Sequence, residues 1–296
     1  MAEARLTPAR PDVAAEHLRG QVEAGRYDPG MAYQITASVL PIRRTPAPDG
    51  PQETQSLFGE SFTVYDEKDG WGWGQAAFDD YVGYVDMAGL SAPVLEPTHR
   101  VTALRSYRYP EPNLKSAPFG LLSMNAKLSV VGEEGDYLKE ARGGYVWKGH
   151  TAPLAEIVQD PVAVAEQFVG GPYFWGGRES LGLDCSALIQ NAYERAGVVV
   201  PRDADLQEKF FSDAANGKPV YQEGASTPWQ DLTYVRGDLF FWPGHVGVMV
   251  DATRMVHATA THMAVAVDDV RTIAKRWEET QGLNVSSVVR PLGAMR

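Results

Sequence analysis

The sequence has one cysteine, Cys185, among its 296 residues. A single thiol cannot form an internal disulfide, so the fold does not depend on an oxidising compartment, and the thiol is either a small buried apolar group or a reactive one. The N-terminus has no apolar run of signal-peptide length, and no later stretch approaches the roughly 20 apolar residues of a membrane span. We therefore expect a cytoplasmic protein, provided that Met1 is the native start.

Basic residues are too few to balance the acidic ones. The chain has 27 Lys and Arg against 38 Asp and Glu, which gives a net charge of −11. Such a chain repels phosphate backbones and anionic lipid surfaces, so we expect neither nucleic acid nor a membrane as a partner. The chain does have a 44% share of apolar residues, with 29 Gly and 20 Pro. This composition predicts a folded, loop-rich protein of several domains with much β structure.

Apolar spacing divides the chain into four segments. Residues 1–30 are predicted to form an N-terminal arm, partly helical over positions 13–22. Short apolar runs separated by Pro, Gly and Asp predict one small β-barrel over 31–93 and a second over 94–152. An internal repeat supports the pair, because FTVY at 62–65 matches LSVV at 128–131 and GYV at 83–85 matches GYV at 144–146. Residues 153–296, with helical stretches and then strands, predict an α+β domain.

The lone cysteine stands at a predicted helix start. In LDCSALIQNAYERAG, Leu188, Ile189 and Ala192 fall at helical spacing, and Gly197 ends the pattern. A helix N-terminus favours the thiolate, so we expect the pKa of Cys185 to be lowered and the thiol to act as a nucleophile. A buried, inert cysteine is the alternative.

Two of the six histidines are candidates for the base that a thiol nucleophile needs. His245 opens a predicted strand after a Pro-Gly turn, and His257 lies on the next strand. The two imidazoles share a face if a three-residue loop follows Val250, a register that the sequence leaves open. The Cys and His spacings include no short metal-type pair, so we expect no metal site. We also expect no cofactor. The remaining histidines are interpreted as surface or packing residues: His17, His99, His150 and His262.

These motifs follow one another in a known order. PYFWGG, LDCSAL, PRDADLQ, RGDLFFW, HVGVMVD and MVHATA, within residues 155–292, resemble the NlpC/P60 cysteine peptidases, and the two barrel segments resemble bacterial SH3-like domains. The resemblance implies a papain-like catalytic domain preceded by two SH3-like barrels. It also implies that Cys185 attacks the peptide carbonyl, that His245 takes its proton and that His257 orients His245. Ala187 stands where the family usually has Gly, a change that a helix tolerates.

The resemblance assigns further roles around the thiol. Tyr173 would assist the oxyanion site together with the backbone N–H of Cys185, or would simply pack beside Trp175. Asp184 would cap the helix, contact substrate, or do both. Ser186 and Trp175 are further candidates for the substrate pocket.

The absent export signal, the two SH3-like units and the motif at 201–203 resemble the cell-wall recycling γ-D-glutamyl-L-diamino acid peptidases of the dipeptidyl-peptidase VI type. That subgroup implies a murein peptide such as L-Ala-γ-D-Glu-diaminopimelate as substrate, with Asp203 recognising its free amine and Tyr81 closing the pocket. A carboxylate that pairs with an ammonium group increases affinity for peptides with a free N-terminus over peptides whose N-terminus is acylated. Ala204 departs from the Ser that the subgroup often has.

Three alternatives stay open at this stage. The chain could be a general endopeptidase of intact wall, a Cys/His acyltransferase, or a wall-binding module whose catalytic domain has decayed. The intact set of Cys185, His245 and His257 argues against the last of these. The sequence leaves open the choice between diaminopimelate and lysine in the substrate, and the oligomeric state.

Overall fold

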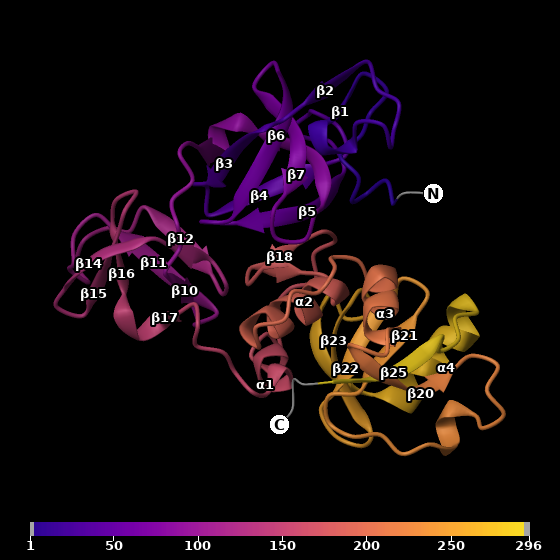
Figure 1. The fold of residues 1–296 in the computed structure, drawn as a ribbon. Helices are drawn as coiled ribbons and strands as arrows, with labels where there is room; N and C mark the ends of the chain where they lie inside the picture. The colour runs from indigo at the N-terminus through magenta and orange to yellow at the C-terminus, as the bar shows by residue number, and fades with distance from the viewer. Residues whose placement is uncertain (1–2, 293–296) are drawn as a thin grey trace. The chain divides into compact units, whose positions relative to one another are not determined.

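The computed structural model describes residues 3–292 and divides the chain into two compact units, Met1–Glu156 and Ile157–Arg296 (Figure 1). Helices are few. The α-helices are α1 (Pro161–Glu166), α2 (Cys185–Arg195), α3 (Ala204–Ser212) and α4 (Val270–Gln281), and the 3-10 helices are η1 (Glu16–Leu18), η2 (Met87–Gly89), η3 (Lys148–His150) and η4 (Trp229–Asp231). Among the described residues, no helix combines the length and apolarity that a membrane crossing requires.

The first unit consists of short strands. They are β1 (Val13–Ala15), β2 (Arg26–Asp28), β3 (Met31–Ile35), β4 (Val39–Arg43), β5 (Gln52–Leu57), β6 (Ser61–Lys68), β7 (Trp71–Ala76), β8 (Val82–Asp86), β9 (Leu90–Ser91), β10 (His99–Val101), β11 (Arg105–Tyr109), β12 (Gly120–Ser123), β13 (Lys127–Leu128), β14 (Val130–Glu134), β15 (Tyr137–Glu140), β16 (Tyr145–Trp147) and β17 (Thr151–Pro153). One sheet has the order β5-β4-β8-β7-β6-β3-β9, and the later strands form sheets β12-β11-β16-β15-β14 and β13-β10-β17. The strands thus fall into an earlier and a later group.

The internal repeat has a structural counterpart. The run β6, β7, β8, η2, β9 is matched by β14, β15, β16, η3, β17, so both halves end in a strand, one 3-10 turn and a short strand. The two groups share a contact, because Phe58 packs in the core of the later group and its carbonyl accepts the N–H of Lys127. Gly59 is required there, since its φ is +82° and a Cβ would lie 2.0 Å from the Lys127 carbonyl oxygen.

The predicted helix at positions 13–22 is wrong except for one turn. Val13–Ala15 form strand β1, which pairs in parallel with β2, and only Glu16–Leu18 are helical, as a 3-10 turn. Val13 and Ala15 are fully buried with Tyr65 and Trp73. Burial of alternate residues of an extended segment against this aromatic pair outweighs the local helical spacing.

The second unit is built on one antiparallel sheet. Its strands are β18 (Arg178–Glu179), β19 (Gly182–Leu183), β20 (Gly217–Gln222), β21 (Leu239–Trp242), β22 (His245–Met249), β23 (Arg254–Thr259), β24 (Ala264–Asp269) and β25 (Ser287–Pro291). The main sheet has the order β20-β25-β21-β22-β23-β24, and α2 lies alongside β22 and β23 (Figure 1). All eleven residues of α2 are buried, so this helix is the centre of the unit.

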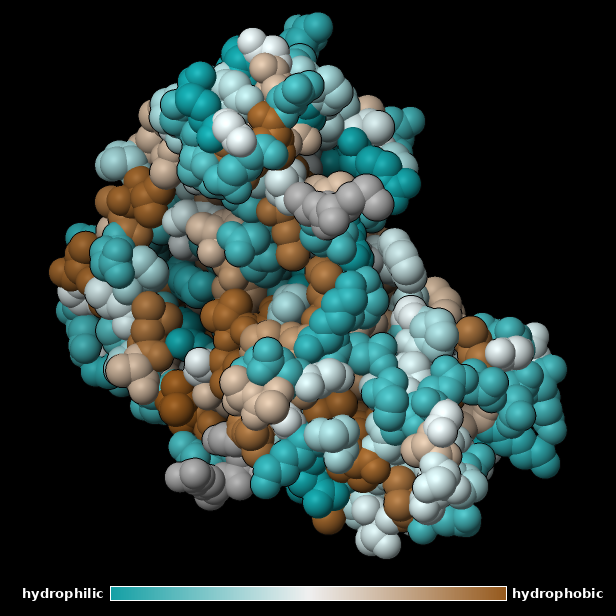
Figure 2. All heavy atoms as spheres, turned by 45° about the vertical axis from the view of Figure 1, so that its right-hand side comes forward, coloured by the Kyte–Doolittle hydropathy of each residue, from teal (hydrophilic) through white to brown (hydrophobic). Residues whose placement is uncertain are grey.

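Two helices of the second unit were not predicted. Residues 205–235 have no pattern that we interpreted, yet α3 begins directly after Asp203. Helix α4 buries Val270, Ile273, Ala274 and Trp277 against the sheet and is capped by Asp269. That spacing and that cap are a readable helix signal. On the face that Figure 2 shows, apolar residues are interspersed with hydrophilic ones.

Candidate active site

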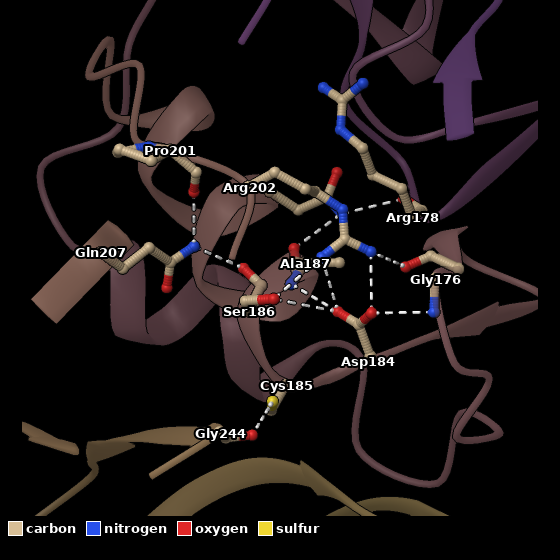
Figure 3. Close-up of polar contacts among 12 residues, drawn as sticks. Gly176, Arg178, Asp184, Cys185, Ser186, Ala187, Pro201, Arg202, Gln207 and Gly244 are labelled. Atoms are coloured by element: carbon tan, nitrogen blue, oxygen red, sulfur yellow. Dashed lines mark hydrogen bonds and ion pairs between the residues drawn. The ribbon is translucent and has the colours of Figure 1, made fainter. Parts of the chain in front are cut away.

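Cys185 is the first residue of α2, as predicted. The side chain of Asp184 caps the helix by accepting the N–H of Ala187 at 3.0 Å. The sulfur lies 3.9 Å from the carbonyl oxygen of Gly244 (Figure 3). The thiol is therefore held against the residue that precedes His245 in the chain.

A buried ion pair fixes the turn that leads into Cys185. Arg202 donates two hydrogen bonds to the carboxylate of Asp184, at 2.9 and 2.8 Å, and a third to the hydroxyl of Ser186 at 2.8 Å (Figure 3). Asp184 also accepts the N–H of Gly176 at 2.9 Å. The structure therefore favours the capping role that we left open for Asp184, and it gives Ser186 partners within the chain. Our sequence interpretation gave Arg202 no role.

The thiol has a different electrostatic setting from the one expected. Burial raises the pKa of Cys185 to about 12, and the charge of Asp184 adds to this, while the N–H groups of Val246 and Ser186 act in the opposite direction. The side chain is 7% exposed, so loss of hydration outweighs the helix N-terminus. The predicted lowering of the pKa of Cys185 is therefore wrong.

His245 and His257 lie on the same face of the sheet. Val248 pairs with Val256 in the register of β22 and β23, and the N–H of Val250 donates to the carbonyl of Arg254, so the loop between them has three residues. This is the register that a shared face required. His245 Nε2 lies 3.0 Å from His257 Nδ1, and the two imidazoles meet edge to face.

A carboxylate that the sequence analysis missed continues this chain of rings. His257 Nε2 lies 3.0 Å from Asp268 Oδ2, and His262 Nε2 lies 2.9 Å from the same oxygen. His262, which we had interpreted as a surface or packing residue, is 43% exposed at its side chain but is bonded to this group. Strand β24 brings Asp268 into place by pairing it with Met255, two residues from His257.

Asp268 determines where the protons of the chain lie. A carboxylate only accepts hydrogen bonds, so His257 donates from Nε2 and its Nδ1 must accept. His245 then donates from Nε2, and its Nδ1 carries the free lone pair. The geometry thus leaves one defined basic atom on His245.

Both imidazoles are held neutral. Burial, followed by the neighbouring His257, puts the pKa of His245 well below its usual value. Burial also lowers the pKa of His257, although Asp268 opposes this. Burial raises the pKa of Asp268, but the hydrogen bonds from His257 and His262 outweigh it, so the carboxylate stays ionised. A neutral pair of rings next to a fixed anion is a proton acceptor.

Tyr173 and Trp175 border a cavity of about 570 Å³ that reaches His245. Burial raises the pKa of Tyr173, and the neighbouring carboxylate of Asp184 raises it further, so the phenol stays protonated and remains a hydrogen-bond donor. Trp175 is 70% exposed.

The two residues expected to recognise the substrate amine lie in different units. Asp203 is the N-cap residue of α3, but its side chain does not cap the helix. It follows Arg202 directly, so the buried ion pair fixes the backbone on which it stands. Tyr81 belongs to the first unit, between β7 and β8. Within residues 3–292, no cluster of three or more His, Cys, Asp or Glu side chains has the arrangement of a metal site.

Known proteins are similar to this chain in sequence and in fold. Residues 170–281 match the NlpC/P60 family, and residues 42–90 match the bacterial dipeptidyl-peptidase Sh3 domain. Dipeptidyl-peptidase 6 of Lysinibacillus sphaericus is 34% identical over 113 residues, which cover 37% of this chain and 35% of that protein. The γ-D-glutamyl-L-lysine dipeptidyl-peptidase of Bacillus subtilis is 24% identical, over 74% of this chain and 76% of the relative.

The fold has a counterpart among solved structures. An NlpC/P60 family protein from Bacillus cereus superimposes with a TM-score of 0.70 at 20% identity, over 89% of this chain and all of that one. The predicted papain-like NlpC/P60 fold is thereby confirmed, whereas the domain bounds and the second SH3-like barrel stay predictions. The chain therefore contains an NlpC/P60 cysteine peptidase domain, with a bacterial dipeptidyl-peptidase SH3 domain ahead of it.

Proposed function

We propose that this chain hydrolyses the γ-D-glutamyl-diamino acid bond of murein-derived peptides that have a free N-terminal L-Ala. The observation that carries the proposal is the pairing of one thiol, held beside His245, with a hydrogen-bonded chain that ends in Asp268. The names of the relatives support the choice of bond, since two of them are γ-D-glutamyl-L-lysine dipeptidyl-peptidases.

In the proposed mechanism, His245 Nδ1 accepts the proton of Cys185 as the sulfur attacks the γ-glutamyl carbonyl carbon. Because the pKa of the thiol is raised and that of the imidazole is lowered, the resting pair is neutral, and proton transfer accompanies attack. The backbone N–H of Cys185 and the hydroxyl of Tyr173 donate to the oxyanion that forms.

The second half of the reaction reverses these roles. The carbon–nitrogen bond breaks as the imidazolium of His245 gives its proton to the leaving amine, which leaves a thioester on Cys185. Water then attacks the thioester with His245 as base, and the released thiolate takes the proton back. Asp268 acts as a positioning residue, because it fixes the orientation of His257 and stabilises the transient positive charge.

Asp203 gives the proposal its selectivity. A carboxylate beside the substrate N-terminus pairs with a free ammonium, whereas an acylated amine leaves that carboxylate without its counter-charge. Tyr81 is proposed to close over the same amine. A peptide still attached to glycan has an amide at this position, so the proposed substrate is a free fragment.

The test is a mass-spectrometric assay of L-Ala-γ-D-Glu-diaminopimelate and its N-acetylated form, with Cys185→Ala as the control. We expect the unmodified protein to release L-Ala-D-Glu from the free peptide alone, and Asp203→Ala to lose this preference. Cleavage of both peptides at equal rates would identify a general wall endopeptidase instead. If neither peptide is cleaved, the proposal fails.

A further inference from the structure

All the residues that line the cavity beside His245 belong to the second unit. One side of the cavity is formed by His245, at the start of β22, and by Thr259–Thr261. The other side is formed by α4, through Arg276, Trp277 and Gln281. Neither Asp203 nor Ser186 lines it. A substrate that has its amine at Asp203 and its carbonyl at Cys185 therefore has only its far side left to occupy this space.

The chemistry of the base leads to the same placement. His245 must return a proton to the leaving amine, so the departing residue lies against this imidazole. His245 is itself part of the cavity lining, and Trp277 packs on its ring with centroids 4.6 Å apart. The α4 wall and the base thus form one continuous surface next to the departing residue.

The charge of the lining is the informative feature. Arg276 is the only permanently charged side chain among the described residues that line the cavity, and none of these residues is acidic. This is unusual in a chain of net charge −11. Within residues 3–292, no carboxylate forms an ion pair with Arg276. The guanidinium is thus a donor group at the mouth of the cavity, with a geometry that suits a carboxylate.

We propose that this cavity binds the diamino acid released by cleavage, and that Arg276 pairs with a carboxylate of that residue. The inference rests on the proposed function and adds its leaving-side specificity. Trp277 and Leu283 supply apolar surface for the methylene chain. A lysine ammonium finds no counter-charge in this lining, whereas diaminopimelate has a second carboxylate in its side chain. The α-carboxylate of the diamino acid is the other group on the departing residue that has the same chemistry.

Four peptides separate these two sources of the carboxylate. They are L-Ala-γ-D-Glu followed by L-lysine or by meso-diaminopimelate, each as the free α-acid and as the α-amide. If Arg276 pairs with the side-chain carboxylate, the diaminopimelate amide exceeds the lysine amide by about fivefold in kcat/KM, the effect of one partly exposed ion pair. If it pairs with the α-carboxylate, each acid exceeds its own amide by a similar factor.

Arg276→Gln should bring whichever ratio is raised close to one, mainly through KM. Lys275→Gln is the matched control, because it removes the same charge from the neighbouring position of α4. Lys275 pairs with Glu279 at 3.8 Å and does not line this cavity, so both ratios should be unchanged in that variant.

The outcomes distinguish this inference from the proposed function. Turnover of all four peptides with ratios that Arg276→Gln leaves unchanged would overturn the role of Arg276 and leave the proposed function intact. Equal changes in Arg276→Gln and Lys275→Gln would show a general charge effect and would also overturn it. If the unmodified protein cleaves none of the four, both proposals fall together.

Discussion

Two buried or partly buried carboxylates support the active site in different ways: Asp184 lies next to the thiol Cys185, and Asp268 supports the base His245 through His257. Asp184, behind the thiol, is paired with the buried guanidinium of Arg202. Asp268, behind the base, is bonded to His257 and His262. An arginine keeps its charge at every working pH, whereas an imidazole can change its charge by one proton. The same residue type therefore anchors the backbone on one side and directs protons on the other.

Removing Arg202, the partner of Asp184, should have the largest effect on stability. Arg202→Leu leaves the carboxylate of Asp184 buried without its cation, and we expect the free energy of unfolding to fall by about 3–5 kcal/mol, measured by urea denaturation. Arg236→Leu is the control, because Arg236 pairs with Asp160 and Glu166 while its side chain is 33% exposed. Its loss should cost less than about 1 kcal/mol. Equal losses for the two variants would contradict a special role for the buried pair.

The alkylation rate of Cys185 tests the environment of the thiol, next to Asp184. Because the pKa of Cys185 is raised to about 12, its alkylation by iodoacetamide should accelerate about tenfold per pH unit between pH 7 and 10. The single cysteine makes the labelling site unambiguous. A rate that is already constant above pH 7 would show a preformed thiolate and would restore the prediction made from the helix N-terminus alone.

Asp268→Asn should affect the protonation of the two histidines, His257 and His245. The amide can donate as well as accept, so it no longer fixes which nitrogen of His257 is protonated. We expect kcat to fall about tenfold, which is less than the roughly 10²–10⁴-fold contribution of a general base, because Asp268 acts on the base only through His257. The free energy of unfolding should change little, because Asp268 lies near the surface. Partial recovery of kcat in Asp268→Glu would separate orientation from packing, and an unchanged kcat in Asp268→Asn would remove this residue from the mechanism.

The acid limb of the pH profile follows from the same side. Since the pKa of His245 lies well below 6.5, the imidazole stays neutral and basic as the pH falls through 6.5, and kcat/KM should begin to fall only at lower pH. A midpoint at or above 6.5 would contradict a base kept neutral by burial.

His262→Ala should have the smallest effect. His262 donates to Asp268 from an exposed position, and His257 still holds the same oxygen in its absence. We expect about a twofold decrease in kcat, measured with the same peptide. A loss as large as that of Asp268→Asn would mean that His262 is essential to the chain of rings.

The positions of the thiol and of the base could be predicted from the sequence, because each depends on its neighbours in the chain. The helix start at Cys185 and the strand start at His245 follow from their immediate neighbours. The pairing of His245 with His257 needed the loop length between two strands, which the sequence only bounded. Asp268 was missed because β24 has its effect through pairing with β23, a contact between segments that no periodicity announces.

Arg202 and the thiol pKa show the other limit. The Pro-Arg dipeptide was recognised as part of a motif, but its partner lies 18 residues away and becomes visible only when α2 is buried. The same burial reverses the expected shift at Cys185. By contrast, helix α4 had its full signal in the sequence, a cap followed by four apolar residues on one face.

Trp277 contacts the catalytic base and also belongs to the cavity wall and to the hydrophobic core. Its ring lies 4.6 Å from the His245 ring and 5.9 Å from the His257 ring, and the same indole forms part of the cavity wall and of the core beneath α4. Whatever shifts the wall therefore shifts the base. Substitutions at this position should alter affinity and turnover together.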